Sequence, residues 1–287
     1  MNCKLAIMHE FFKKIDVFSN ISFDEEWHSY KLNGKRTVSV TKVTGAVKEP
    51  FDAVKKSKEC VERMRREAEE AGQPIPTITP EELQDQWART NLIARAKGSA
   101  VHKYIEMTIA NKVQRYPKDI VDAEFAKDLE KNPKMTFDCD PVLPLYKKIT
   151  PMVDQFLADI RGKMYPVRSE LVIGSPRYNV CGMIDQIFYN NKSQAFEIWD
   201  WKTNTKFDTT SKFHLEDPCS HLEACKLVEY SLQLHCYKRI FEEETGIEIK
   251  NCYLCWFSEA QPTYKVMKCV DVSKEAQTLL ERAVENA

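Results

Sequence analysis

Three strand-like runs that follow one another in the middle of the chain constrain its fold more than any other feature. They cover residues 167–173, 178–190 and 195–202, and a polar turn at 190–192 joins the last two. A helical pattern over about 222–244 follows, then strand-like runs near 250–257 and 263–271 and a helix from about 273. This order predicts an α/β fold with a mixed central β-sheet flanked by helices.

The N-terminal half is expected to add a hairpin to that sheet. Residues 27–44 alternate apolar and polar side chains around Asn33-Gly34. This dipeptide is typical of a type I′ turn, so we predict a β-hairpin there.

Helices are expected between the hairpin and the first central strand. Residues 51–71 are charged and carry a thin apolar stripe at helical spacing. Thr79, Pro80 and Glu82 form a capping box that begins a helix reaching about residue 111. Further helices are predicted over 119–130 and 144–161.

The chain length fits one elaborated α/β domain. At ~150 residues per domain, 287 residues suggest about two domains, but a single α/β unit of this length is ordinary. We therefore expect 1–91, the hairpin and helical elaboration, to pack on a core formed by 92–287 as one structural unit.

Composition excludes several classes of protein. Lys plus Arg is 42 and Asp plus Glu is 43, so a histone-like binder with a broad cationic surface is excluded, while a local basic groove remains possible. The sequence contains no run of 18 apolar residues, so no membrane span is expected. The first 16 residues lack the features of a signal peptide, so we expect an intracellular protein without a membrane partner.

The candidate chemistry lies in residues 180–202. Residues two apart on a strand share a face, so Asp200 and Lys202 should point one way while Trp199 and Trp201 pack under a helix on the other. Asp185, on the preceding strand, could lie across from Asp200. Two close carboxylates repel each other, and Mg²⁺ or Mn²⁺ suits such hard oxygen ligands.

Lys202 would then orient the attacking water or stabilise charge on a phosphate oxygen. An Asp-X-Lys tripeptide by itself is more typical of a solvated strand end.

Two helical patterns add candidate ligands. His102 and Glu106 are four residues apart, hence on one helical face, and His102 could supply an imidazole to the same metal. Gln233 and Tyr237 share a face of a later helix. Taken alone, a helical histidine is more often structural, and the second pair fits ordinary packing.

Taken in order, these motifs resemble the RecB-type branch of the PD-(D/E)XK nuclease superfamily over about residues 92–257. The matching elements are Gly98…His102…Glu106, Glu170 on a strand, Gly182-Met-Ile-Asp185, Asp200-Trp-Lys202-Thr203 and Gln233…Tyr237. Position 200 is Asp where many members have Glu, but Asp is common in this branch. Ser39-Val40-Thr41 after the hairpin is also similar to phage, large-virus and mitochondrial genome maintenance exonucleases of the group.

The resemblance implies a PD-(D/E)XK core that hydrolyses DNA phosphodiester bonds with Mg²⁺ or Mn²⁺, most often as an exonuclease on single-stranded ends, in replication, recombination or repair. It assigns the metal to His102, Asp185, Asp200 and the Trp201 carbonyl, and the attacking water or scissile phosphate to Lys202. Gln233 and Tyr237 would contact the substrate or brace the site, and Thr203 and Lys206 would contact the substrate. Glu106 would act as a structural or outer group; Glu170, counted with the catalytic residues, has the same two possible roles. A second metal would need Glu170 or substrate oxygens, and one or two metals remain open.

DNA is the expected partner, with a helicase or recombinase as a further one. Candidate phosphate contacts are Arg161, Lys163, Arg168, Lys206 and Lys212, and Tyr178 and Phe207 could stack on unpaired bases. For each of these residues the alternative is a solvated surface position without a role in DNA binding. The sequence has no GxxxxGK[ST] loop, so no nucleotide cofactor is expected.

The ten cysteines are expected to be mostly small buried residues. Some relatives bind an iron–sulfur cluster through one cysteine before the first motif and three after the last, and Cys60, Cys252, Cys255 and Cys269 have that order. Cys252 and Cys255 should face opposite sides of a strand, so we expect no cluster. A non-catalytic nucleic-acid-binding subunit, an endonuclease and an RNA-directed nuclease remain alternatives on the same site.

Overall fold

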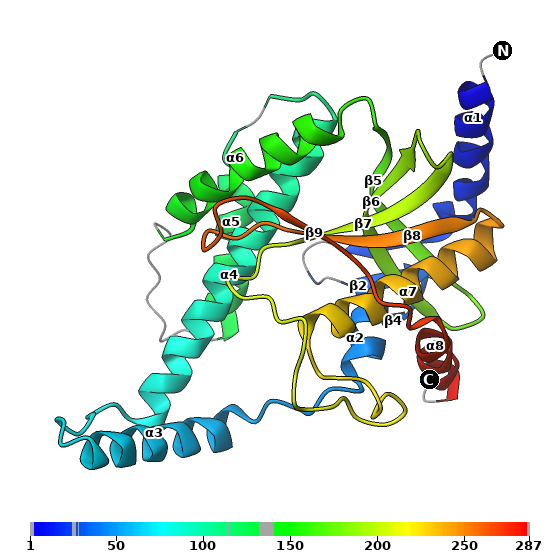
Figure 1. Cartoon of the computed structure of the whole chain (residues 1–287). Helices are drawn as coiled ribbons and strands as arrows, with labels where there is room; N and C mark the ends of the chain where they lie inside the picture. Colours follow the sequence, from blue (N-terminus) through cyan, green and yellow to red (C-terminus); the bar gives the residue numbers. More distant parts are fainter. Residues whose placement is uncertain (1–2, 25–26, 28, 114, 132–140, 286–287) are drawn as a thin grey trace. The chain divides into compact units, whose positions relative to one another are not determined.

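The structure is a computed structural model that describes residues 3–24, 27, 29–113, 115–131 and 141–285 (Figure 1). The chain forms two compact units: Met1–Lys48 with Pro151–Ala287, and Glu49–Thr150. The expected boundary after residue 91 lies inside helix α4 (Pro80–Ile109), and that division stays a prediction.

Within the described residues, a six-stranded mixed sheet forms the centre of the first unit (Figure 1). Its strands are β4 (Val38–Ser39), β5 (Met164–Ser175), β6 (Val180–Asn190), β7 (Ala195–Lys202), β8 (Ile249–Trp256) and β9 (Lys265–Lys268). The order is β4-β6-β7-β8-β9, with β5 also paired to β6. The β4–β6 and β7–β8 pairs are parallel and the others antiparallel, so the predicted mixed sheet flanked by helices is confirmed.

Helix α7 (Lys226–Thr245) packs along this sheet (Figure 1). Its residues Leu232, Ile240 and Phe241 share one buried core with Ile198 of β7 and Leu254 of β8. The other helices of this unit are α1 (Cys3–Ile15), the 3-10 helix η1 (Asp16–Asn20), α2 (Val40–Gly45) and α8 (Ser273–Glu285). The predicted end of α7 is confirmed, because Gly246 caps the helix in the left-handed conformation that glycine adopts without strain.

The tryptophans of β7 pack under another helix, as predicted. Helix α6 (Val142–Ile160) begins in the second unit and ends in the first. Its Phe156 ring lies 5.6 Å from the rings of both Trp199 and Trp201. Since alternate residues of a strand point to opposite faces, Asp200 and Lys202 face away from α6.

The hairpin predicted over residues 27–44 is confirmed at its turn, but the prediction is wrong for its C-terminal part. Strands β1 (Ile21–Asp24), β2 (Ser29–Leu32) and β3 (Lys35–Arg36) form a small antiparallel sheet. Asn33 and Gly34 both have positive φ, 50° and 76°, as a type I′ turn requires. Beyond it, residues 38–39 join the central sheet instead, and 40–45 form helix α2 because the Ser39 side chain caps it by accepting from Lys42 N.

The second unit is helical in its described residues. It contains α3 (Ala53–Glu70), α4, α5 (Lys118–Lys131) and the start of α6, all close to the predicted ranges. The capping box at α4 is confirmed: Thr79 Oγ1 accepts from Glu82 N at 3.1 Å, and Glu82 Oε2 accepts from Thr79 N at 2.8 Å. Among the helices that the structure describes, none is both long and apolar enough to cross a membrane.

Candidate functional site

Three carboxylates lie in one row across neighbouring strands β5, β6 and β7. The registers that define the row are Ser169↔Gln186, Leu171↔Ile184 and Gln186↔Trp199. The first two place Glu170 opposite Asp185. The pairing of β6 with β7 ends at Gln186↔Trp199, and Asp185 and Asp200 are the next residues on their strands. A carboxylate oxygen of Glu170 lies within 4.8 Å of one of Asp185. The predicted approach of Asp185 to Asp200 stays a prediction, and the charges of both act on Lys202.

A backbone hydrogen bond orients the middle carboxylate. Trp201 N donates to Asp185 Oδ2 at 2.8 Å, across from one strand to the next. A charged acceptor makes this bond stronger than a neutral one, so it fixes the direction of the Asp185 side chain. The carbonyl of Trp201, predicted as a metal ligand, stays a prediction.

Glu170 has an unusual backbone. Its φ is +48°, in the left-handed region that side-chain-bearing residues rarely adopt. A residue held there costs on the order of 1–3 kcal/mol, and such residues cluster at functional sites. The strand therefore departs from regular geometry at the residue whose carboxylate approaches Asp185.

Lys202 is held between an acid and an aromatic ring. Its Nζ lies 2.5 Å from Asp200 Oδ2 and 4.2 Å from the centroid of the Tyr230 ring, which belongs to α7. Burial lowers the pKa of Lys202, but the Asp200 and Asp185 carboxylates more than offset that effect, so the pKa is raised. Lys202 is thus a fixed cation, and the predicted shared face with Asp200 is confirmed.

Gln233 and Tyr237 contact each other on α7, as their spacing predicts. Gln233 Nε2 donates to Tyr237 Oη at 2.8 Å, and the Tyr237 ring lies against Gly182 of β6. Burial raises the pKa of Tyr237; the bond from Gln233 lowers it, and Asp200 raises it further. Tyr237 is therefore a neutral hydroxyl close to the carboxylates.

Sequence reasoning missed Tyr30 of β2. This residue is 5% exposed, and its ring stacks on Phe23 with centroids 4.7 Å apart. Burial raises its pKa, and the negative charges of Glu170 and Asp185 raise it further. The hairpin thus brings a buried aromatic side chain near enough for the charges of Glu170 and Asp185 to act on it, and its apolar alternation was the only signal that could have suggested this.

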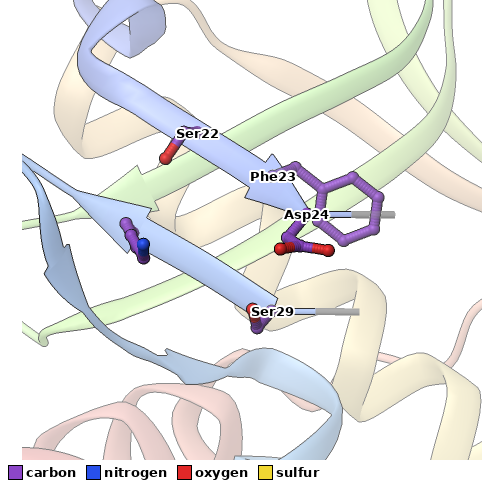
Figure 2. Close-up of a pocket in the computed structure, with 5 residues that line it drawn as sticks. Ser22, Phe23, Asp24 and Ser29 are labelled. Carbon is purple, nitrogen blue, oxygen red and sulfur yellow. The ribbon is translucent and has the colours of Figure 1, made fainter. Parts of the chain in front are cut away.

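The polar face of the same hairpin carries a separate pocket. Figure 2 shows Ser22, Phe23 and Asp24 on one strand and Ser29 on its neighbour; Lys31 completes the lining of a volume of about 340 Å³. None of the predicted site residues lines this pocket.

The remaining predicted residues belong to other elements. Thr203, 9% exposed, and the exposed Lys206 follow β7. His102 and Glu106 lie on α4 in the second unit, where Glu106 Oε2 pairs with Lys103 Nζ at 2.7 Å.

The predicted basic residues are available on the surface, and one predicted aromatic is not. The exposed cations are Arg161, Lys163, Arg168, Lys206 and Lys212. The prediction that Tyr178 stacks on bases is wrong, because Tyr178 is 1% exposed within the core and its hydroxyl donates to Glu243.

The donor set of the row fits a hard divalent cation. Glu170, Asp185 and Asp200 offer carboxylate oxygens, the ligands that Mg²⁺ and Mn²⁺ prefer. Like charges this close raise each other's free energy, and a bound cation would relieve that repulsion. Within the first unit, Glu170 and Asp185 have carboxylate oxygens close enough for one divalent cation to contact both.

Comparisons with known proteins yield only distant likenesses. No family model matches the sequence, and no curated protein matches it. One similar solved structure is that of a "Putative exonuclease" from Eubacterium rectale, with 14% identity and a TM-score of 0.37 over 68% of this chain. Another is the structure of SSO0001, with 11% identity and a TM-score of 0.29 over 59% of this chain and 71% of that one. The chain spans 64% of the length of the Eubacterium rectale protein.

Proposed function

We propose that this protein is a metal-dependent DNA exonuclease that hydrolyses phosphodiester bonds from single-stranded ends. The observation that carries the proposal is the row of Glu170, Asp185 and Asp200 with Lys202 fixed beside it. Carboxylates that attract a divalent cation, next to an ammonium group, are the charges that phosphodiester hydrolysis needs. The ordered motifs resembling RecB-type PD-(D/E)XK nucleases add DNA ends as the substrate and replication, recombination or repair as the setting.

In this proposal, Asp185 and Asp200 hold the cation, and Glu170 adds a further oxygen. His102 joins them, as the ordered sequence motifs imply. A bound Mg²⁺ or Mn²⁺ supplies Lewis-acid charge to the scissile phosphate. The backbone N–H of Trp201 keeps the Asp185 carboxylate oriented toward that position.

The chain's own residues supply the other steps. The Lys202 ammonium donates a hydrogen bond to the attacking water or to a phosphate oxygen, and stabilises the negative charge that grows there. Gln233 and Tyr237, joined by their hydrogen bond, present an amide and a hydroxyl to the substrate. The exposed cations Arg168 and Lys206 contact phosphates of the strand.

The test is cleavage of end-labelled linear single-stranded, linear double-stranded and covalently circular DNA with Mg²⁺, Mn²⁺ or EDTA. We expect metal-dependent loss of linear single strands with circles spared. Asp200→Asn and Lys202→Met should lower kcat by roughly 100-fold or more. Lys250→Met, at an exposed position of β8, is the matched control and should cleave like the natural protein.

Other outcomes would replace the proposal. Cleavage that survives Asp200→Asn or Lys202→Met would show that the chemistry lies elsewhere. Cut circles would identify an endonuclease, and faster cleavage of RNA an RNA-directed enzyme. DNA binding without turnover in any metal would identify a non-catalytic binding subunit.

A further inference from the structure

We propose that Tyr230 is a positioning residue for Lys202: its ring holds the lysine ammonium beside Asp200, and Asn204 holds the ring. The role in catalysis rests on the proposed function, while the contact itself does not. None of the sequence motifs includes Tyr230 or Asn204.

The first support is the surroundings of the ammonium. Lys202 Nζ lies over the Tyr230 ring, 4.2 Å from its centroid, and 2.5 Å from Asp200 Oδ2. The Lys202 side chain is only 15% exposed. Attraction between a cation and an aromatic face strengthens when water is excluded, so this contact restricts Lys202 more than a surface contact would.

The second support is that the ring itself is anchored. Asn204 Nδ2 donates to Tyr230 Oη at 2.9 Å, and Trp256 Nε1 donates to the Asn204 carbonyl at 2.7 Å. The Phe207 ring packs 5.8 Å from Tyr230 and 5.5 Å from Trp256. The hydrogen bonds run from the end of β8 through the segment after β7 to α7, so the position of the ring is set by three parts of the fold.

The third support is the place of Tyr230 on its helix. Tyr230, Gln233 and Tyr237 follow one another at intervals of three and four residues, so they share one face of α7. Tyr237 lies close enough to Asp200 and Asp185 for their charges to raise its pKa. Tyr230 extends this face toward the start of the helix, where Lys202 ends β7.

A lysine needs such support because its side chain is a flexible four-carbon stem with a strongly hydrated charge. Asp200 attracts the ammonium but leaves it free to swing around the carboxylate. The ring adds a second contact at 4.2 Å and so restricts the positions that the ammonium can take. Tyr230 touches Lys202 and no reacting atom, so its effect should be on kcat through Lys202.

The experiment compares Tyr230→Leu, which removes the ring, with Tyr230→Phe, which keeps it. On linear single-stranded DNA, Tyr230→Leu should lower kcat about tenfold or more with KM little changed, because a misplaced catalytic group costs rate rather than binding. Tyr230→Phe keeps the ring but loses the hydrogen bond from Asn204, so its kcat should lie between those of Tyr230→Leu and the natural protein. In a Lys202→Met background, Tyr230→Leu should have no further effect. The matched control is Tyr165→Leu. Tyr165, on β5, also has a lysine over its ring, with Lys4 Nζ 4.4 Å from the ring centroid, so the control removes a comparable contact that does not involve Lys202.

A second readout does not depend on cleavage. In protein labelled with ¹³C at the lysine ε-carbon, the ring current of Tyr230 should shift the Lys202 ε-methylene protons upfield. The resonance is assigned by its loss in Lys202→Met. The shift should disappear in Tyr230→Leu and persist in weakened form in Tyr230→Phe, which has no hydroxyl for Asn204 to hold. If Tyr230→Leu does not fold, Asn204→Ala, which releases the ring, should weaken both the shift and kcat.

The outcomes separate the two proposals. An unshifted Lys202 resonance in the natural protein, or full kcat in a folded Tyr230→Leu protein, would overturn the positioning role. A natural protein that cleaves nothing but shows the shifted resonance would refute the nuclease and keep the Lys202–Tyr230 contact.

Discussion

The ring of Tyr237 lies directly against the backbone of Gly182. A Cβ atom added at Gly182 would stand 2.4 Å from Tyr237 Cε1, closer than real Cβ contacts come. Gly182 lies three residues before Asp185 on β6, so the absence of a side chain there lets α7 bring its tyrosine down beside the carboxylate row.

Gly182→Ala should therefore destabilise the protein by about 1–3 kcal/mol, the usual cost of forcing extra volume into a packed site. Gly45→Ala is the control, because nothing lies within 4 Å of a Cβ at Gly45 and its φ is ordinary. Urea unfolding measures both. Combined with Tyr237→Leu, Gly182→Ala should cost little more than Tyr237→Leu alone; simple additivity would contradict the contact.

The contact between Gly182 and Tyr237 could not be predicted from the sequence, although each residue could be placed in its element. Periodicity places Tyr237 on a helical face with Gln233, but how that helix docks depends on core packing throughout the sheet. Asp200 and Lys202 were easier, because a period of two on one strand decides their shared face. The strand of Asp185 could be predicted to lie beside that of Asp200, because a short turn joins the two strands.

The end of the hairpin and the role of Tyr30 show where local pattern fails. Val38, Val40 and Val43 favour a strand by propensity, but Ser39 caps a helix and buries Val40 and Val43 in the core. Tyr30 packs with Cys181, a residue more than 100 positions away in the chain, and no local periodicity can predict such a contact. The positive φ of Glu170 could not be predicted from the sequence either, because residues with a side chain rarely adopt it.

Glu170→Gln should make the metal-free protein more stable and abolish most of its stabilisation by metal. The substitution keeps the shape of the side chain but removes a negative charge within 4.8 Å of Asp185, and like charges at that distance oppose folding. Thermal unfolding with EDTA and with Mn²⁺ measures both effects. The exposed Glu248, immediately before β8, provides the control Glu248→Gln, which should leave both unfolding temperatures unchanged. An unchanged response of Glu170→Gln to Mn²⁺ would exclude Glu170 from the metal site.

Lys202→Met should destabilise the metal-free protein by roughly 3 kcal/mol, because it removes the cation from a carboxylate that is buried. The Asp200 side chain is 5% exposed, so water cannot replace the ammonium well. The double variant Asp200→Asn, Lys202→Met should recover much of the lost free energy of unfolding. Mn²⁺ should recover part of it in Lys202→Met alone. Chemical denaturation of the three proteins, with and without Mn²⁺, tests this. Equal stability of Lys202→Met and the natural protein in EDTA would show that the ion pair of Lys202 with Asp200 contributes nothing to the free energy of unfolding.

Tyr264 should make stability fall between about pH 10 and pH 12. Its hydroxyl donates to Asp159 Oδ2 at 2.6 Å, and burial, followed by this bond, raises the pKa of Tyr264 to about 12. An unfolded tyrosine has a pKa of about 10. A group whose pKa is raised by folding contributes stability that is complete below the unfolded pKa and lost as pH rises through the folded one.

Tyr264→Phe removes both the hydrogen bond and the titration. It should be less stable near neutral pH by about 1 kcal/mol, the net worth of one hydrogen bond. It should then lose less stability than the natural protein across the alkaline window, so that the two denaturation free energies converge as pH rises. Parallel curves would mean that the bond to Asp159 does not form. Because this bond joins the segment between β8 and β9 to α6, parallel curves would also remove one anchor of the helix that covers Trp199 and Trp201.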